Sequence, residues 1–159
     1  MGLPIRADAM GYYMRYISTD SQDITLPWLQ EAMRRIDPRY SIEGQEKGRR
    51  EAGFLHFAGE LYGQFEINRA GDGLFEQEIE EFMGGAEAGE EEGHKIVLEV
   101  LNAARCIVAL QVFWQDRGTE ATLERISPLW SLLFDTRSGL LQADAEGFYR
   151  GTELILPSG

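Results

Sequence analysis

Carboxylates are the side chains of this sequence whose number and spacing most clearly suggest a chemical role. Nine of the 27 acidic residues lie between Asp72 and Glu92, a segment that contains no lysine or arginine. A concentrated negative field speeds association with a positively charged partner. Carboxylate oxygens are also ligands for Ca²⁺ and Mg²⁺, but the Asp-x-Asp-x-Asp-Gly calcium-loop pattern is missing. The segment therefore favours a docking surface over a metal site.

The predicted partner-binding residues combine these acids with one aromatic side chain. Trp28 falls off the apolar line formed by Leu26, Leu29 and Met33, so we expect it to be exposed and available for a contact. A plainer interpretation of the acids is a solvated helix face followed by a flexible loop. The predicted set is Glu76, Glu80, Glu87, Glu90, Glu91, Glu92 and Trp28.

A second group of candidate residues lies near the C-terminus. On a continuous strand Asp144 and Glu146 would face the same way and, together with Tyr149, could line a pocket. Paired carboxylates perform general acid–base catalysis when burial separates their pKa values. The simpler interpretation, which the sequence favours, is a hairpin turn at Glu146-Gly147 with Asp144 on its solvated flank.

Other catalytic or cofactor-binding patterns are missing from the sequence. It has no dinucleotide-binding, phosphate-loop or nucleophile-elbow motif. With only His56, His94 and Cys106 as potential nitrogen or sulfur ligands, a zinc site is not expected. Cys106 opens an apolar run and fits a small core residue better than a reactive thiolate. We therefore predict no metal, no cofactor and no identifiable catalytic residue.

Charge and composition narrow the classes of partner. The net charge of −12 over 159 residues argues against a nucleic-acid binder and against an anionic-membrane binder. A single cysteine allows no intramolecular disulfide, which fits the cytoplasm. The first residues contain no apolar segment of the kind found in signal peptides. Both Met1 and Met10 are candidate start residues, and a start at Met10 would make the preceding residues an extension of the fold. Residues 1–10 are therefore expected to be flexible.

Self-association is an alternative to a separate basic partner. A basic segment precedes the acidic one, and a second copy of the chain could pair the two segments head to tail or about a twofold axis. The basic residues concerned are Arg34, Arg35, Arg39, Lys47, Arg49 and Arg50.

The element that must organise the fold is the apolar run Arg105–Gln115. Alternate residues of this run are apolar on both sides, which is typical of a strand in the middle of a sheet. Around it the patterns predict strands at 12–18, 53–57, 61–68, 139–145 and 148–156. They also predict helices at 26–36, 73–83 and 91–104, and a helix from 119 that Pro128 either kinks or restarts as a second helix. A loop is predicted at 40–50 and a flexible acidic loop at 84–93.

These elements predict an α+β fold in one domain over residues 1–159, with a mostly antiparallel sheet covered by helices on one face. The order strand, helix, hairpin occurs twice. It suggests two βαββ units, residues 11–83 and 94–157, in a pseudo-twofold, ferredoxin-like arrangement. Chance similarity between the two halves is the alternative.

The leading functional hypothesis is a non-enzymatic cytosolic interaction module. Its acidic face would bind a basic protein, as an inhibitor, an immunity-type protein or a regulatory subunit does. The alternative is a small hydrolase or ligand-binding enzyme that uses the carboxylates near Asp144 and Glu146.

Overall fold

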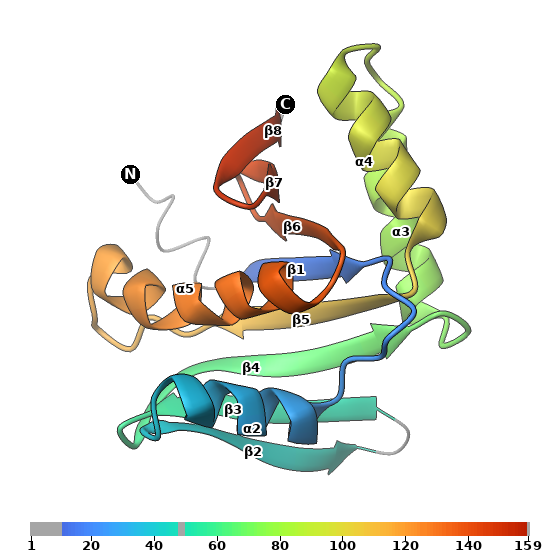
Figure 1. Cartoon of the computed structure of the whole chain (residues 1–159). Coiled ribbons are helices and arrows are strands. Elements are labelled where there is room, and N and C mark those ends of the chain that lie inside the picture. The colour runs from blue at the N-terminus through green and yellow to red at the C-terminus, as the bar shows by residue number, and fades with distance from the viewer. Residues whose placement is uncertain (1–10, 48–49, 159) are drawn as a thin grey trace.

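The computed structural model describes residues 11–47 and 50–158, with side chains for all of these except 45–47 and 50. The expectation about residues 1–10 lies outside this described part. In chain order the elements are β1 (Tyr12–Ser18), α2 (Leu26–Ile36), β2 (Tyr40–Lys47), β3 (Arg50–Phe57), β4 (Glu60–Arg69), α3 (Leu74–Ala86), α4 (Glu92–Ala103), β5 (Cys106–Val112), α5 (Thr119–Thr136), β6 (Gly139–Ala143), β7 (Gly147–Arg150) and β8 (Glu153–Pro157) (Figure 1).

The strands of the described chain form one eight-stranded antiparallel sheet in the order β2-β3-β4-β5-β1-β6-β7-β8. β5 lies between β4 and β1 and pairs with both, which confirms the predicted central strand. Its alternate residues enter two different cores, because successive side chains of a strand point to opposite faces. Val108 and Leu110 belong to one core, and Ile107 and Ala109 belong to the other.

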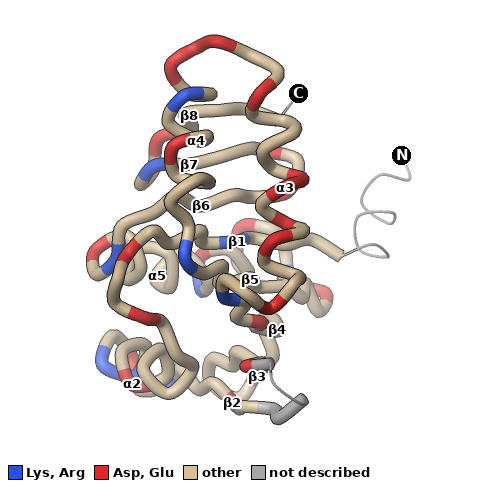
Figure 2. The backbone as a smooth tube through the Cα atoms, turned by 90° about the vertical axis from the view of Figure 1, so that its right-hand side faces the viewer, with Lys and Arg blue, Asp and Glu red and all other residues tan. Residues whose placement is uncertain are grey.

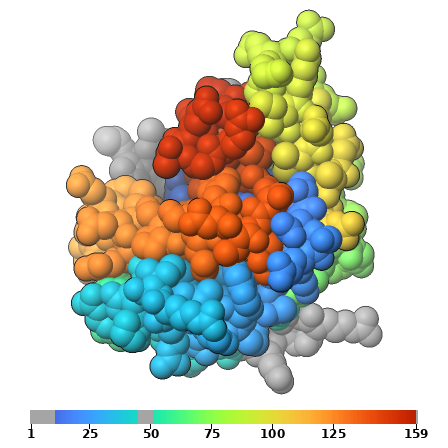
Figure 3. Space-filling model, in the orientation of Figure 1, coloured from blue at the N-terminus to red at the C-terminus, as the bar shows by residue number. Residues whose placement is uncertain are grey.

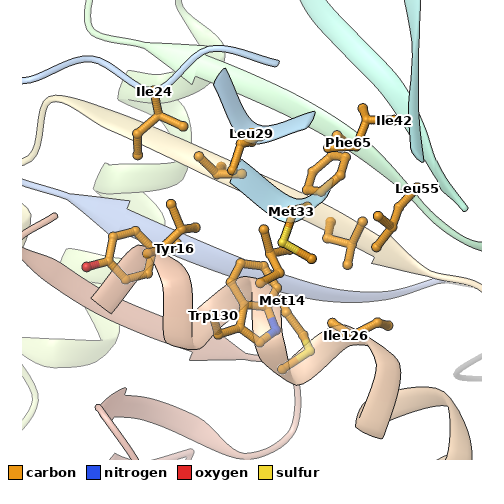
Figure 4. Packing of buried hydrophobic residues seen from close by; sticks show 14 of the residues in the cluster. Met14, Tyr16, Ile24, Leu29, Met33, Ile42, Leu55, Phe65, Ile126 and Trp130 are labelled. Atoms are coloured by element: carbon orange, nitrogen blue, oxygen red, sulfur yellow. The ribbon is translucent and has the colours of Figure 1, made fainter. Parts of the chain in front are cut away.

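Helices α2 and α5 lie side by side over the first face of the sheet (Figures 1 and 3). α2 begins where Thr25 Oγ1 accepts a hydrogen bond from the backbone N–H of Trp28, at 3.3 Å. Leu29 and Met33 of α2 then meet α5 residues such as Trp130 above the strands (Figure 4). Burial of these side chains supplies most of the driving force for this layer.

The second face of the sheet is covered by α3 and α4, but only in part. Val97 and Leu101 of α4 pack with Ile17, Ile107 and Leu140 from the strands. The α+β class and the antiparallel sheet are therefore confirmed, whereas the prediction of helices on one face is wrong. The apolar side chains on both faces of β5 are the physical reason, since each face needs its own cover.

The structure does not confirm the ferredoxin-like duplication. In the first half, α2 leads to β2 at the edge of the sheet, three strands away from β5. In the second half, α5 leads to β6, which pairs directly with β1. The two halves share an order of elements along the chain but not an order of strands in the sheet.

Several predicted elements have the expected ranges, and others do not. The strand 12–18 and the helix 26–36 are confirmed residue for residue. The loop predicted at 40–50 is wrong, because Tyr40–Lys47 forms the edge strand β2 with its apolar residues Tyr40 and Ile42 turned inward. α5 continues through Pro128 as one helix, so of the two predicted outcomes, a kink or a restart, the restart does not occur.

Two further boundaries differ from the sequence prediction. The flexible loop predicted at 84–93 is shorter than expected, because α3 continues to Ala86 and α4 begins at Glu92. Only residues 87–91 lie between the two helices. The strand predicted at 148–156 is divided into β7 and β8 by a turn at Gly151, whose positive φ of 64° suits glycine.

Candidate partner-binding surface and neighbouring pockets

α3 and α4, with the short connection 87–91, form a helical hairpin that we call the acidic hairpin. Figures 1 and 2 show it lying against the side of the sheet formed by β6, β7 and β8. A Cβ at Gly93 would lie 1.9 Å from the backbone oxygen of Ile155, so α4 approaches β8 closely there. A hydrogen bond of 2.8 Å joins His94 Nδ1 of α4 to the backbone oxygen of Ala86 at the end of α3. These contacts position the hairpin.

The acidic residues gather where α3 meets α4, as the red segments of Figure 2 show. Within the residues that the structure describes, five of the predicted partner-binding acids are exposed and form no ion pair. They are Glu80, Glu87, Glu90, Glu91 and Glu92. Lys95, on the following turn of α4, is also exposed. The prominent end of the hairpin is therefore strongly negative.

Glu76 has a structural task at the start of α3. Its carboxylate accepts hydrogen bonds from the backbone N–H groups of Gly71 and Gly73, at 2.7 and 2.9 Å. These bonds hold the pKa of Glu76 below its usual range. Asp72 adds a second cap by accepting the N–H of Phe75 at 2.7 Å. Glu76 is exposed, but its oxygens are already occupied.

Trp28 is half-buried, so the expectation that it is exposed is wrong. Its ring packs against the first core, and the guanidinium carbon of Arg137 lies 4.3 Å from the ring centroid. Arg137 is itself buried and donates to the backbone oxygens of Gln22 and Asp23. Trp28 lies off the apolar line of α2 but is still covered, because Arg137 at the end of α5 packs over its ring.

The residues of the basic segment differ in exposure and in pairing. Arg34 and Arg35 are exposed on α2, and Arg35 pairs with Glu31 one turn earlier. Arg39 pairs with Asp37 at 2.8 Å. The side chains of Lys47, Arg49 and Arg50 lie outside the described part of the chain.

A polar network that the sequence did not indicate is centred on Arg15 of β1. Its Nε donates to Glu78 of α3 at 2.7 Å, and one terminal nitrogen donates to Gln142 and Asp144, at 2.7 and 2.9 Å. The side chains of Arg15, Glu78 and Asp144 are only 15%, 23% and 33% exposed. Burial raises the pKa of Glu78, and the neighbouring Arg15 opposes that rise.

The sequence carries one weak signal for this network. Arg15 stands between Met14 and Tyr16, which are buried in the first core, so Arg15 must point to the opposite face of β1. Its partners are 63 and 129 residues away along the chain, and no local pattern joins them.

A polar pocket of about 400 Å³ opens beside this network, between α3 and the strands β4, β5 and β1. Asn68 lies in its wall with 3% exposure, and its Oδ1 has no hydrogen-bond partner among the described residues. Its Nδ2 donates to Glu66 at 3.4 Å. The polar residues of the lining are Tyr13, Arg15, Gln64, Glu66, Asn68, Gln77, Glu78, Glu81 and Gln111. We call this cavity the α3 pocket.

The structure separates Asp144 from Glu146. Both lie in the favoured turn, where Ala145 has a positive φ of 66°. Asp144 turns toward Arg15 and accepts the N–H of Tyr13 at 2.9 Å. Glu146 instead accepts the hydroxyls of Tyr12, at 3.0 Å, and of Tyr149.

Glu146 and Tyr149 are therefore brought together, on the α5 side of the sheet. They line a largely apolar groove of about 450 Å³ that also contacts Trp130 of α5. The hydrogen bond to Glu146 raises the pKa of Tyr149, and burial raises the pKa of Tyr12. Asp144 does not belong to this groove.

Other potential sites are limited in the described part of the chain. No group of three or more histidine, cysteine, aspartate and glutamate side chains there is arranged to hold a metal ion. Cys106 is buried, and burial raises its pKa to about 11, which confirms it as a core residue. Among the described helices, none combines the length and apolar character needed to cross a bilayer.

Comparison of the chain with protein-family models, with curated proteins and with solved structures found no match to any of them.

Proposed function

We propose that this protein is a non-enzymatic interaction module whose acidic hairpin binds a basic protein in the cytoplasm. The observation that supports the proposal most directly is the arrangement of the hairpin acids. Five of the predicted partner-binding carboxylates are exposed on one projecting element, and within the described residues none is neutralised by an ion pair.

Physical chemistry favours a partner for such an element. Like charges close together on a helix surface repel and slightly destabilise it, and among the exposed hairpin acids only those at the start of α4, such as Glu92, are favoured by the helix dipole. Toward a positively charged surface the same field speeds association and excludes acidic competitors. The hairpin is also fixed against the sheet by the close approach of Gly93 to β8, so little ordering free energy is lost on binding.

The proposal is tested with two variants of equal net charge. The first replaces the hairpin residues Glu87, Glu90, Glu91 and Glu92 by glutamine. The control replaces four acids that are exposed elsewhere and form no ion pair within the described residues: Glu43, Glu120 and Glu124 by glutamine and Asp135 by asparagine. Both changes remove four negative charges and leave the hydrogen-bonding shape of the side chains nearly unchanged.

Tagged full-length protein then captures partners from a lysate of the organism that carries this sequence, at low and at raised salt. We expect a basic protein that the wild type and the control retain and the hairpin variant loses. The affinity of the purified pair should fall by about tenfold or more in the hairpin variant and by less than about threefold in the control. Equal retention by both variants, or capture that raised salt does not weaken, would refute a charge-led hairpin interface.

A further inference from the structure

We infer that the α3 pocket receives an arginine side chain of the basic partner and anchors it beside the acidic hairpin. This inference rests on the proposed function and names the site that would give the partner its specificity. Exposed carboxylates alone provide attraction at long range, whereas a partly enclosed pocket provides the short-range recognition that selects one side chain.

Hydrogen-bond acceptors converge on this pocket from two sides. Glu66 and Asn68 lie two residues apart on β4 and so share one face of the sheet. Glu78 and Glu81 face them from α3. Asn68 is 3% exposed, its Oδ1 accepts no hydrogen bond from the residues that the structure describes, and a buried acceptor without a donor is costly. A ligand rich in N–H groups would relieve that cost.

The charge of the lining favours a cation. The carboxylates of Glu78 and Glu81 on α3 line the pocket together with the guanidinium of Arg15 on β1. Arg15 is also shared with Asp144, which lies outside the lining. Burial raises the pKa of Glu78 despite the opposing effect of Arg15 2.7 Å away, which agrees with a carboxylate that one cation compensates only in part. A second cation in the pocket would complete the compensation.

Arginine suits this lining better than lysine does. Its planar guanidinium presents five N–H donors in a fixed geometry, which matches several acceptors placed around one cavity. The pocket also offers the ring of Tyr13, which already lies 4.9 Å from the guanidinium carbon of Arg15. Lysine would bring one compact charge and fewer directed bonds.

The pocket is continuous with the proposed docking surface. Leu74, Gln77, Glu78 and Glu81 lie on one face of α3, and α3 leads directly into the acidic end of the hairpin. Figure 2 shows the acidic positions following α3 down to the level of β4 and β5. A basic protein drawn to the hairpin could therefore place one side chain in the pocket without losing the hairpin contacts.

The test uses the full-length protein and a hexa-arginine peptide as the probe, titrated calorimetrically at low salt. Gln77 is exposed on α3 and lines the pocket, so a Gln77→Arg substitution would place the protein's own guanidinium at the site. The matched control is Asn102→Arg, an exposed position on α4 that adds the same charge away from the lining. A Glu81→Gln variant removes one carboxylate from the pocket, and its control, Glu124→Gln, removes one from an exposed position on α5.

We expect Gln77→Arg and Glu81→Gln to weaken binding of the peptide about tenfold or more, and the two controls to weaken it less than about threefold. In NMR spectra of the wild type, N-acetyl-arginine amide should shift the Asn68 side-chain amide signals, and Gln77→Arg should abolish that shift. A hexa-lysine peptide should bind more weakly than hexa-arginine.

Failure of this inference is distinguishable from failure of the proposed function. If the pocket variants weaken the peptide no more than their controls, or if the Asn68 signals do not move, the pocket is not the anchor. The hairpin proposal would then still stand or fall on its own four-residue variants. If hexa-arginine does not bind the wild type at all, both proposals are contradicted.

Discussion

Replacing Arg15 by methionine should destabilise the protein far more than replacing any exposed arginine. The substitution leaves the carboxylates of Glu78 and Asp144 without their cation, although they are only 23% and 33% exposed. Removing one partner of a fully buried ion pair costs about 3–5 kcal/mol, whereas an exposed pair contributes about 0–1 kcal/mol. The Arg15 network lies between these limits, so we expect a loss of about 2–3 kcal/mol in the free energy of unfolding.

The loss should depend on pH in a defined direction. Burial raises the pKa of Glu78 in the folded state, so the folded protein binds that proton more tightly than the unfolded chain does. Stability attributable to Glu78 therefore falls as the pH rises through this pKa. Without Arg15 the pKa rises further, so the penalty of the substitution should be largest near neutral pH and should shrink on acidification below the raised pKa.

Urea unfolding followed by tryptophan fluorescence, at neutral and at acidic pH, measures both effects. Arg34→Met is the matched control, because Arg34 is exposed on α2 and has no ion pair within the described residues. It should change stability by no more than about 0.5 kcal/mol. In the double variant with Glu78→Met, the two losses should not add, because the second change removes one of the unpaired charges. A loss below about 1 kcal/mol for Arg15→Met, or a loss that grows on acidification, would refute this account of the network.

Three smaller predictions concern single residues elsewhere. Gly93→Ala should destabilise the protein and loosen the hairpin from the sheet, because the new Cβ would lie 1.9 Å from the backbone oxygen of Ile155. Gly84→Ala, in open space on α3, should instead stabilise the protein by up to about 1 kcal/mol. The urea unfolding midpoints of the two variants test both predictions. Thr25→Ala should cost about 1 kcal/mol by removing the cap of α2, which denaturant unfolding measures. Cys106, with its pKa raised to about 11, should react with a thiol reagent only on unfolding, and rapid labelling in the native protein would contradict its burial.

Elements with strong local patterns could be predicted from the sequence. β1 and α2 have the expected boundaries because alternation in Tyr12–Ser18 and the cap at Thr25 are local features. β5 could be placed in the middle of the sheet because both of its faces are apolar. That same property implied a second helical layer, which the prediction of helices on one face overlooked.

Elements at the margin of the sheet were harder to predict. In β2, Tyr40 and Ile42 are buried on the face that α2 covers, whereas Ser41 and Glu43 on the other face are exposed. Only two residues therefore carry an apolar pattern for this strand. The division of the strand at Gly151 was not predicted, although Gly151 lies among the polar residues Arg150, Thr152 and Glu153, which together are a turn signal.

The candidate sites show the same division between local and distant information. The acidic residues could be assigned to one element because they are contiguous in the sequence. The Arg15 network and the α3 pocket could not, because they join β1, β4, α3 and the turn after β6. The alternative pocket was wrong in one respect: Asp144 and Glu146 are separated, because the turn between them sends the two carboxylates to different faces.

The most direct test of the central claim is the association rate constant of the purified partner, or of hexa-arginine if no partner is captured, with the two four-residue variants of equal net charge. If the acidic hairpin forms the interface, the hairpin variant should associate several-fold more slowly than the control at low salt, and the difference should diminish as salt is added. Equal association rates at low salt would show that net charge alone matters, and that the hairpin is an ordinary solvated surface.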